Sequence, residues 1–474
     1  MMISVLFLIP VLLSVPAFLF NSKRINNFIL VWYSIMHLTI TILLYIYGGG
    51  LGEYFQTDKL NILFLLVQSV LLFCVSIYSV NFLKTSEIKW HKYYTISFLF
   101  FILSMDCAIL SAHLALMWVF IEATTLTSAI LIYYHKTKSA VEATWKYIFI
   151  CSIGISFAFI GIILISIGCK NIESLFFKDL YGSGNAIIQF WIKFAFPFIL
   201  VGFGTKMGLA PVHAWLPDAH SESPSPVSAI LSGALLNAAL LGILRVYKIC
   251  SIYGLNEFAE NLFLIMGFLS LIISAAYIIK ISNYKRMLAY SSIENMGIIS
   301  IGFGLGGRFG VFAALLHLVG HSLIKASLFL TSGNILHIYQ TKDSNNIRGL
   351  LKIDSVTGWL WLFGILAICG FPPFSIFMSE ILILKSMFAA KQYFKFILFI
   401  VLLTVILYGL VEKTLKMISY NAIEKIDKSH IETGFCVYAP QMMLLGCALI
   451  LGLYIPNKVL NILSGAALWF ENFR

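Results

Sequence analysis

The chain has 474 residues, of which 60% are hydrophobic and only 11% are charged, and its formal net charge is +11. This composition excludes a soluble globular domain and indicates an integral membrane protein. Lysines and arginines in membrane loops explain the positive charge, so it does not call for nucleic-acid binding. At about 20 residues per crossing, the apolar runs predict an all-α membrane domain of about fourteen transmembrane helices.

The predicted helices follow one another along the whole chain. In order they occupy residues 3–21, 27–48, 60–83, 93–111, 113–134, 143–168, 188–219, 223–249, 257–281, 286–306, 308–338, 355–390, 393–412 and 438–472. The first has no basic region before it and no clear cleavage site, so we interpret it as a membrane helix and not a signal peptide. Lysines and arginines are more abundant in the loops that would be cytoplasmic if both termini lay outside, which favours that orientation.

Glu122 lies about midway along the predicted helix 113–134. A carboxylate at membrane depth is costly, so by default it indicates a functional site. Burial and a nearby lysine act on a carboxyl group in opposite directions, and that balance is typical of a switchable proton site. The alternative is a structural carboxylate that is held by threonine hydroxyls or by Lys146.

Lys206 lies in the predicted helix 188–219, just before Pro211 and Pro217. Proline removes a helix hydrogen bond, so this segment is predicted to be broken. A broken helix at membrane depth survives only where it is buried or lines a wet cavity. Lys206 could release and rebind a proton there, or it could simply be satisfied by carbonyl groups that the break frees. Asp218, His220 and Glu222 follow, and they form either an inner mouth or a solvated turn.

The next candidate residues along the chain are Glu294 and a stripe that consists of His317, His321 and Lys325. The last three are spaced i, i+4 and i+8, so they share one helix face. Two histidines at this spacing can bind a metal, but no third ligand or general base accompanies them, so no metal site is predicted. Imidazole can accept a proton at one nitrogen and donate one at the other, which favours a proton relay. The alternatives are core histidines bonded to carbonyl groups, and a Glu294 that pairs with Arg286.

Glu380 follows a second predicted break at Pro372 and Pro373, in the predicted helix 355–390. It could end the ionisable series, or it could be a carboxylate that faces a positive helix end. The spacing from Glu122 to Lys206 nearly equals that from Glu294 to Glu380. This similarity predicts two inverted five-helix repeats, since an odd helix number per unit reverses its orientation. The predicted divisions are residues 1–92 (three helices), 93–249 (first repeat), 257–412 (second repeat) and 413–474 (a cytoplasmic loop and the last helix).

The sequence does not predict a cofactor in this chain. The 8 cysteines are scattered singly, without a C-x-x-C pair, so neither an iron–sulfur cluster nor a structural zinc site is expected. The glycines between Gly302 and Arg308 lack the spacing and the preceding strand of a dinucleotide fingerprint. We also predict no catalytic residue.

Three stretches together resemble the antiporter-like membrane subunits of respiratory complex I, multisubunit cation/proton antiporters and membrane-bound group 4 hydrogenases. They run from Lys206 to Asp218, from Lys285 to Ser292 and from His317 to Lys325. The runs 120–125, 290–294 and 372–380 are more similar still to component F of hydrogenase-4. The similarity covers predicted helices 3 to 13, which is most of the chain.

The resemblance implies a fourteen-helix fold with inverted repeats, with breaks in helices 7 and 12, in a bacterial or archaeal cell membrane. It implies proton translocation that is driven by redox chemistry in partner subunits, which would hold the cofactors. By resemblance the proton path comprises six residues: Glu122, Lys206, His317, His321, Lys325 and Glu380. Glu294, an ionisable group in an apolar run, is the seventh predicted member. Many complex I relatives carry a lysine or histidine on helix 8, but here that helix offers only Ser232 and Asn237, so water held by these side chains is expected to bridge Lys206 to helix 11.

We therefore predict a non-catalytic, proton-translocating subunit of a hydrogenase-4-like or NADH dehydrogenase-type complex, with membrane and soluble subunits as partners. The first alternative is a subunit of a monovalent cation/proton antiporter, in which sodium would replace or accompany the proton. A quinone-binding catalytic subunit is a further alternative, against which the missing ligand motifs argue. A passive scaffold is disfavoured because it could use leucine at these positions.

Overall fold

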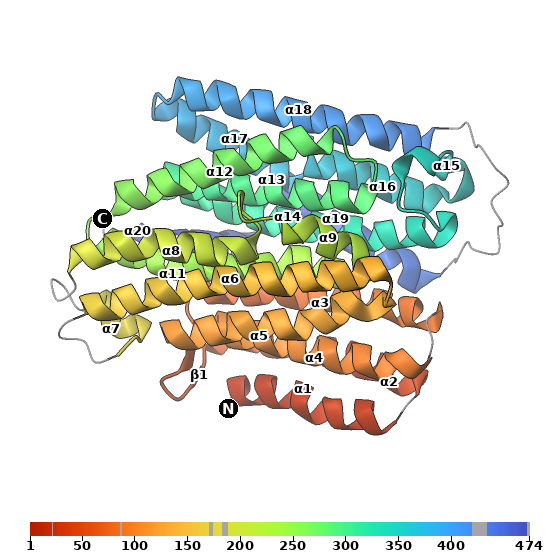
Figure 1. Cartoon of the computed structure of the whole chain (residues 1–474), viewed down its shortest axis with the longest axis horizontal. Helices are drawn as coiled ribbons and strands as arrows, with labels where there is room; N and C mark the ends of the chain where they lie inside the picture. The colour runs from red at the N-terminus through yellow and green to blue at the C-terminus, as the bar shows by residue number, and fades with distance from the viewer. Residues whose placement is uncertain (21, 86–87, 170–173, 183–187, 420–433, 472–474) are drawn as a thin grey trace.

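The computed structural model shows a bundle of roughly parallel helices (Figure 1). It describes residues 1–20, 22–85, 88–169, 174–182, 188–419 and 434–471. The predicted ends at residues 21 and 472, and part of the predicted loop after residue 413, lie outside these ranges. The helix α1 begins and the helix α20 ends at the same end of the bundle.

Nearly all of the described chain is helical. The elements in chain order are α1 (Met2–Leu19), α2 (Lys23–Tyr47), β1 (Gly50–Leu51), β2 (Phe55–Gln56), α3 (Asn61–Thr85), α4 (Ile88–Leu110), α5 (Leu114–Ile132), η1 (Tyr133–His135), α6 (Lys138–Gly168), α7 (Phe177–Gly182), α8 (Gln189–Met207), α9 (Trp215–Glu222), α10 (Ser225–Ile230), η3 (Leu231–Leu235), α11 (Leu236–Ile252), α12 (Asn256–Ile278), α13 (Tyr284–Leu305), α14 (Gly307–Tyr339), η4 (Ser344–Asn346), α15 (Leu350–Ile353), α16 (Ser355–Ile368), α17 (Ser375–Ala389), α18 (Tyr393–Ile418), α19 (Phe435–Leu453) and α20 (Asn457–Glu471). The strands β1 and β2 form one antiparallel hairpin.

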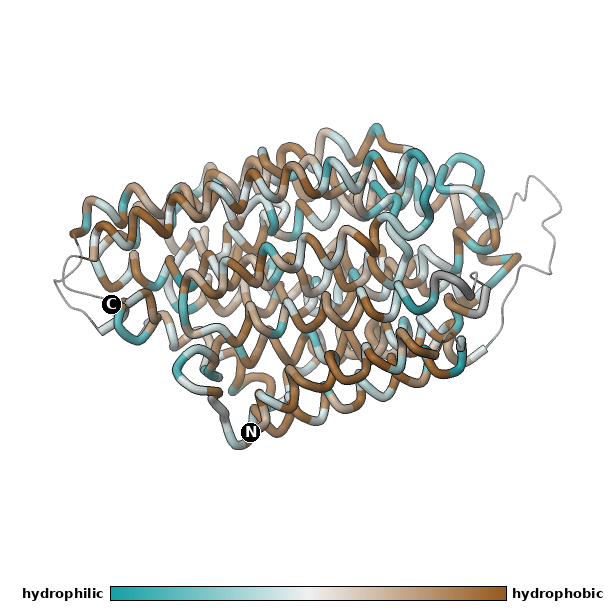
Figure 2. Tube along the Cα trace, turned by 60° about the horizontal axis from the view of Figure 1, so that its bottom comes forward, coloured by the Kyte–Doolittle hydropathy of each residue, from teal (hydrophilic) through white to brown (hydrophobic). Residues whose placement is uncertain are grey.

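Among the described residues, 12 helices are long and apolar enough to cross a membrane. The prediction of about fourteen differs for two physical reasons. The helix α13 has 22 residues but carries many polar side chains, and α16 and α17 are short pieces of 14 and 15 residues. Hydrophobic residues run along the lengths of the helices and hydrophilic ones gather toward their ends (Figure 2). The all-α membrane fold is therefore as predicted.

Burial separates the inside of the bundle from its lipid-facing edge. The apolar windows of α1 and α18 are each only 22% buried, whereas that of α14 is 94% buried. In Figure 1, α1 and α18 lie at opposite edges of the bundle, with α14 between them. Because α14 carries the predicted stripe of two histidines and a lysine, that stripe lies in the interior.

Two predicted helices are broken near their prolines. The segment 188–219 divides into α8 and α9. Pro211 lies in the break, while Pro217 lies in the first turn of α9, where a proline costs no helix hydrogen bond. The segment 355–390 divides into α16 and α17, with Pro372 and Pro373 between them.

Several boundary predictions were wrong. The helix predicted at 93–111 begins at Ile88, and the helix predicted at 393–412 continues to Ile418, so the loop predicted from residue 413 begins later. The segment 438–472 is two helices, α19 and α20, because Pro456 restricts the residue before it and favours a helix end there. The segment 143–168 begins earlier, at Lys138, since the Thr137 side chain caps the amide of Ala140. In addition, a π-helical segment η3 interrupts the predicted helix 223–249.

The break between α19 and α20 lies beside the break between α16 and α17. A Cβ added at Gly452, near the end of α19, would collide with the backbone of Pro373 and Phe374. Only glycine permits this close approach of the two backbone segments. Two interruptions of the helical hydrogen bonds therefore meet, and exposed side chains such as Phe371 and Tyr454 lie beside them.

Candidate functional site

Lys206 lies in the last turn of α8, fully buried. Its Nζ donates hydrogen bonds to Thr125 Oγ1 at 2.7 Å and to the hydroxyl of Tyr147 at 2.6 Å. The same Nζ lies 4.6 Å from the centroid of the Tyr147 ring. A cation is favoured at this end of a helix because the last carbonyl groups carry partial negative charge.

Thr125 connects Lys206 to Glu122. Its hydroxyl accepts from Lys206 and donates to Glu122 Oε2 at 3.1 Å, and Ser152 donates to Glu122 Oε1 at 2.7 Å. Glu122 is therefore held by a threonine hydroxyl, as the structural alternative predicted. The same hydroxyl, however, also accepts a hydrogen bond from Lys206. Lys146 instead pairs with Glu142 at 2.6 Å and Asp218 at 3.1 Å.

Tyr147 extends this series of hydrogen bonds in a second direction. Its hydroxyl lies 2.6 Å from Ser128 Oγ, and its ring packs against Trp215 with centroids 4.9 Å apart. The series Glu122–Thr125–Lys206–Tyr147–Ser128 therefore joins α5, α6 and α8. We did not predict Tyr147 or Ser128, because uncharged hydroxyl groups in a helix give no signal in a single sequence.

The break after Lys206 is satisfied by protein groups. The indole of Trp215 donates to the carbonyl of Thr205 at 2.7 Å, and the amide of Ala210 donates to Ser270 Oγ at 2.9 Å. Gly208 adopts a φ of 83°, which an L-residue rarely adopts. Backbone groups freed at membrane depth need such partners.

A second ionisable cluster surrounds α14. His317 lies 2.9 Å from Ser379 Oγ through Nδ1 and 3.0 Å from Asn295 Oδ1 through Nε2. Because the amide oxygen of Asn295 only accepts, His317 Nε2 carries the proton in this arrangement. Lys325 donates to the carbonyl of Leu288 at 2.7 Å. The stripe therefore faces α13 and α17.

Glu294 and His321 hold polar atoms without a hydrogen-bond partner among the described residues. They are Glu294 Oε2 and both ring nitrogens of His321. Glu294 lies within electrostatic range of Lys325 and of Glu380, while Arg286, its alternative partner, pairs with Asp218 at 2.7 Å. Buried polar atoms without a protein partner in a native fold commonly face water.

Glu380 approaches the break between α16 and α17. It is the sixth residue of α17, beyond the first turn, and it is buried. A Cβ on Gly370 would lie 2.8 Å from the carboxyl carbon of Glu380. The carboxyl group therefore packs against the backbone of the break.

The predicted eighth helix, 223–249, corresponds to α10, η3 and α11. It is hydrogen-bonded directly to α13 and α14, which carry the second cluster. Asn237 donates to Ser322 Oγ on α14 at 2.8 Å, and Ser232 in η3 lies 2.8 Å from Ser292 Oγ on α13. The hydrogen bonds of Lys206 lead back to Glu122, whereas those of Asn237 lead forward to α14. The step between Lys206 and Asn237 is where the predicted bridging water would have to lie.

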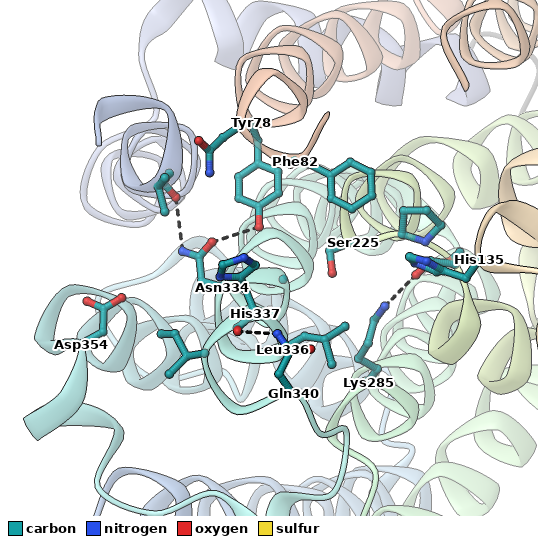
Figure 3. Close-up of a pocket in the computed structure, with 16 residues that line it drawn as sticks. Tyr78, Phe82, His135, Ser225, Lys285, Asn334, Leu336, His337, Gln340 and Asp354 are labelled. Atoms are coloured by element: carbon teal, nitrogen blue, oxygen red, sulfur yellow. Dashed lines mark hydrogen bonds between the residues drawn. The ribbon is translucent and has the colours of Figure 1, made fainter. Parts of the chain in front are cut away.

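A cavity of about 200 Å³ opens at the end of the bundle where α14 ends. Figure 3 shows His135, Lys285, Asn334 and His337 among its lining side chains. Lys285 is buried there and donates to the carbonyl of Ser223 at 2.7 Å. The cavity therefore has several polar side chains in a partly apolar lining, and it is large enough for several waters.

His220 is buried and not part of a solvated turn. Its ring stacks on Phe329 of α14 with centroids 4.8 Å apart, and neither nitrogen has a partner among the described residues. His220 lies within electrostatic range of Lys285 at the cavity and of His321 and Lys325 on α14.

Glu222, at the end of α9, belongs to the surface beside this cavity. It accepts from Lys342 at 2.9 Å and from Ser139 at 2.9 Å. Burial would raise its pKa, but the hydrogen bond and charge of Lys342 outweigh burial and lower it. Among the residues that the structure covers, no three His, Cys, Asp or Glu side chains are grouped to hold a metal.

Comparison with known proteins decides the family. Residues 111–407 match the family model described as NADH:quinone oxidoreductase/Mrp antiporter, transmembrane. The chain belongs to this family. It is therefore an antiporter-like membrane protein of multisubunit complexes, as the motifs predicted.

Individual relatives agree with this assignment. The chain is 33% identical to a hydrogenase-4 component F homolog of Methylacidiphilum infernorum, over 95% of this chain and 94% of the relative. It is 30% identical to hydrogenase-4 component B of Escherichia coli, over 71% of this chain and 51% of the relative. It is also 30% identical to a Na(+)/H(+) antiporter protein of Alkalihalophilus pseudofirmus, over 72% and 44%. The chain thus spans about half of these two longer relatives.

Solved structures share the fold. A chain of the membrane-bound sulfane sulfur reductase, an archaeal respiratory membrane complex, superposes with a TM-score of 0.88 at 22% identity, over 99% of this chain and 98% of that one. A chain of the Mrp complex from Dietzia sp. superposes with a TM-score of 0.84 at 20% identity, over 98% and 96%. Both of these chains belong to multisubunit membrane complexes.

Proposed function

We propose that this chain translocates protons through the membrane arm of a redox-driven complex of the hydrogenase-4 type. The observation that carries the proposal is the series Glu122–Thr125–Lys206–Tyr147–Ser128, in which a buried lysine is hydrogen-bonded through one hydroxyl to a carboxylate. Charged groups at membrane depth are costly and mark proton or ion pathways. The second cluster around α14 supplies the onward groups.

Glu122 is the group that faces a neighbouring protein of the complex. It is only partly buried, and large apolar side chains are exposed nearby on α5 and α6, including Leu126, Trp145 and Phe149. Exposed apolar surface of this kind meets lipid or another membrane protein. A charge change at that boundary would reach Lys206 through Thr125, and so alter how firmly Lys206 holds its proton.

Protons enter through the cavity that Lys285 and His337 line. His220 receives the proton behind the cavity and passes it to His321 and Lys325 on α14. His317, bonded to Asn295 and Ser379, and then Glu380 form the later part of the route. Water completes the steps that side chains do not, between Lys206 and Asn237 and around the unpartnered atoms of Glu294 and His321.

Redox partners are favoured over a stand-alone antiporter by the extent of similarity. The component F homolog aligns with 95% of this chain and over 94% of its own length, whereas the Na(+)/H(+) antiporter protein aligns over only 44% of its length. The redox cofactors would belong to soluble and membrane partner subunits. Both termini would lie outside the cytoplasm of a bacterial or archaeal cell.

The test is proton pumping by the purified complex in sealed vesicles. We expect a pH-sensitive dye to report proton movement that starts with the electron donor, stops when the donor is exhausted and collapses with a protonophore. Proton flux that needs a sodium gradient and ignores the donor would instead support a cation/proton antiporter. The similarity to the Na(+)/H(+) antiporter protein keeps that function as the second candidate.

The variant His220→Phe is expected to slow donor-driven pumping several-fold without loss of assembly. Phenylalanine keeps the stacking on Phe329 but cannot carry a proton. The matched control is His337→Phe, at the lining of the same cavity, where water can bypass the side chain. Initial pumping rates at equal complex content measure both, and equal rates for His220→Phe and the unaltered complex would remove His220 from the route.

A further inference from the structure

A buried acid–base pair lies outside the site described above and outside the part of the chain that matches the family model. His37 on α2 and Asp106 on α4 are both fully buried, and they precede the matched residues 111–407. His37 Nε2 lies 2.9 Å from Asp106 Oδ1 and 3.1 Å from Oδ2. Gln68 of α3 donates to Asp106 Oδ1 at 2.7 Å. Three helices thus converge on one carboxylate.

The surrounding hydrogen bonds decide which atoms hold protons. Ser69 Oγ lies 2.7 Å from the carbonyl of Leu65, 2.9 Å from Thr41 Oγ1 and 2.9 Å from His37 Nδ1. Ser69 is the donor toward both the Leu65 carbonyl and Thr41 Oγ1, so its single proton points to one of these two oxygens, and His37 Nδ1 must donate to Ser69. One further proton then lies between His37 Nε2 and Asp106, whichever of the two atoms carries it.

That shared proton is the one the pair can exchange. With it the pair is neutral overall, and without it a buried carboxylate faces the lone pair of His37 Nε2 at 2.9 Å. Buried uncompensated charge of this kind is disfavoured by several kcal/mol. The pair therefore binds a single proton, and the charge of this layer depends on that proton.

Two neighbouring oxygens give the pair a route to other proton carriers. The free side-chain oxygen of Gln68 and the hydroxyl of Tyr33 are buried and have no partner among the described residues. The Tyr33 ring packs edge-on to His37 with centroids 5.8 Å apart. Buried oxygens without protein partners are where ordered water is found.

The other titratable groups around the pair are few. Tyr33 on α2 and Cys107 on α4 are the groups that interact electrostatically with Asp106 besides His37. The helix α1 carries no titratable side chain, and α5 carries only Glu122, whose carboxylate is bonded to Thr125 and Ser152. No basic side chain other than His37 lies close enough to Asp106 to replace the proton, within the part of the chain that the structure describes.

We propose that His37 and Asp106 form a second proton-binding site, in the layer of α2, α3 and α4, separate from the series through Lys206. In Figure 1 these helices lie on the side of the bundle toward α1, away from α18. Asp106 is one turn before the end of α4, and Ser111, the residue after α4, pairs with Phe55 of the hairpin, so this end of the bundle is the nearer one to the pair. The proposal does not depend on the direction of pumping.

The test uses the assembled complex and two readouts. Infrared spectroscopy across a pH titration should show one carboxyl or imidazole transition that disappears in both Asp106→Asn and His37→Gln. Asparagine keeps an oxygen that accepts from Gln68, and its NH2 group can donate to Nε2 of a neutral His37, so no exchangeable proton remains between the two side chains. The conservative Asp106→Glu should retain a shifted transition. Glu122→Gln is the matched control, because it removes a carboxylate from the other series and should leave this transition in place.

Donor-driven pumping is the second readout. We expect a several-fold lower rate for Asp106→Asn and recovery for Asp106→Glu. If Asp106→Asn assembles, shows the same infrared titration as the unaltered complex and pumps equally at every pH, the pair is a structural contact and the proposal fails. A transition that moves with sodium at constant pH would mark a metal-cation site and would equally overturn it. Failure of the proposed function is separate, because it would abolish donor-driven pumping in the unaltered complex while leaving the infrared titration intact.

Discussion

Replacement of Lys206 by methionine is expected to lower donor-driven proton pumping by about a hundred-fold, the lower range for loss of a positioned proton-transfer group. Methionine has a similar length and fills the same buried space, but it neither holds a proton nor donates to Thr125 and Tyr147. The series from Glu122 would then end at Thr125. Pumping per electron pair in sealed vesicles, at matched complex content, is the measurement.

Lys206→Arg separates charge from proton transfer. Arginine keeps a positive charge at the end of α8 but does not release its proton under any physiological condition. If Lys206 only holds the break together, the arginine variant should pump. If Lys206 carries a proton, it should fail as the methionine variant does. Normal pumping by either variant in an intact assembly would contradict the central role of Lys206.

Thr125 offers a finer comparison within the same experiment. Thr125→Val has nearly the same shape but removes the hydroxyl between Lys206 and Glu122. Thr125→Ser keeps that hydroxyl. The expected order of pumping rates is therefore Thr125→Ser above Thr125→Val above Lys206→Met.

Most of the fold could be predicted from the sequence because the membrane imposes simple lengths on apolar helices. The apolar runs predicted every long span, and the prolines near residues 211 and 372 pointed to the two interrupted segments. The break before Pro456 was missed because the apolar residues continue on both sides of it, so hydropathy alone shows one helix. The helix α13 is a different case. Its buried polar residues lower its hydropathy below that of an ordinary membrane span, so hydropathy alone does not identify it as one.

The sequence identified the ionisable residues of the site but not the side chains that form hydrogen bonds with them. Ionisable residues in apolar runs pointed to Lys206, and the i, i+4, i+8 spacing put His317, His321 and Lys325 on one face. Their partners could not be predicted, since contacts such as Lys206 with Tyr147 join residues 59 positions apart. His37 and Asp106 satisfy the same rule as Lys206, an ionisable group in an apolar run, and they were still missed.

Breaks in the helices lie next to buried ionisable groups. Lys206 comes directly before the interruption of α8, Glu380 packs on the interruption between α16 and α17, and η3 disturbs the helix that links to α13 and α14. Interrupted helices free backbone groups and admit water in a region that is otherwise apolar. Local irregularity of the helices and buried ionisable groups therefore occur together at Lys206 and Glu380.

Gly370→Ala is expected to reduce pumping by about ten- to a hundred-fold, as a displacement of about 1 Å in a reacting group commonly does. Gly370 has a φ of 68°, and an added Cβ would lie 2.8 Å from the carboxyl carbon and 3.1 Å from Oε1 of Glu380. The methyl group must therefore push the carboxyl group away from the break. The left-handed backbone adds a penalty of about 1–2 kcal/mol for any residue other than glycine.

Gly307→Ala distinguishes these two effects. Gly307 has a φ of 61°, nearly that of Gly370, but a Cβ there would meet nothing within 4 Å. Both variants should lose thermal stability through the shared backbone penalty, and Gly370→Ala should lose at least as much as Gly307→Ala because its methyl group also displaces Glu380. Only Gly370→Ala should lose pumping, because only there does the methyl group displace Glu380. Equal pumping by the two variants would show that the position of the Glu380 carboxyl group does not matter, and Glu380 would then have to be removed from the proton route.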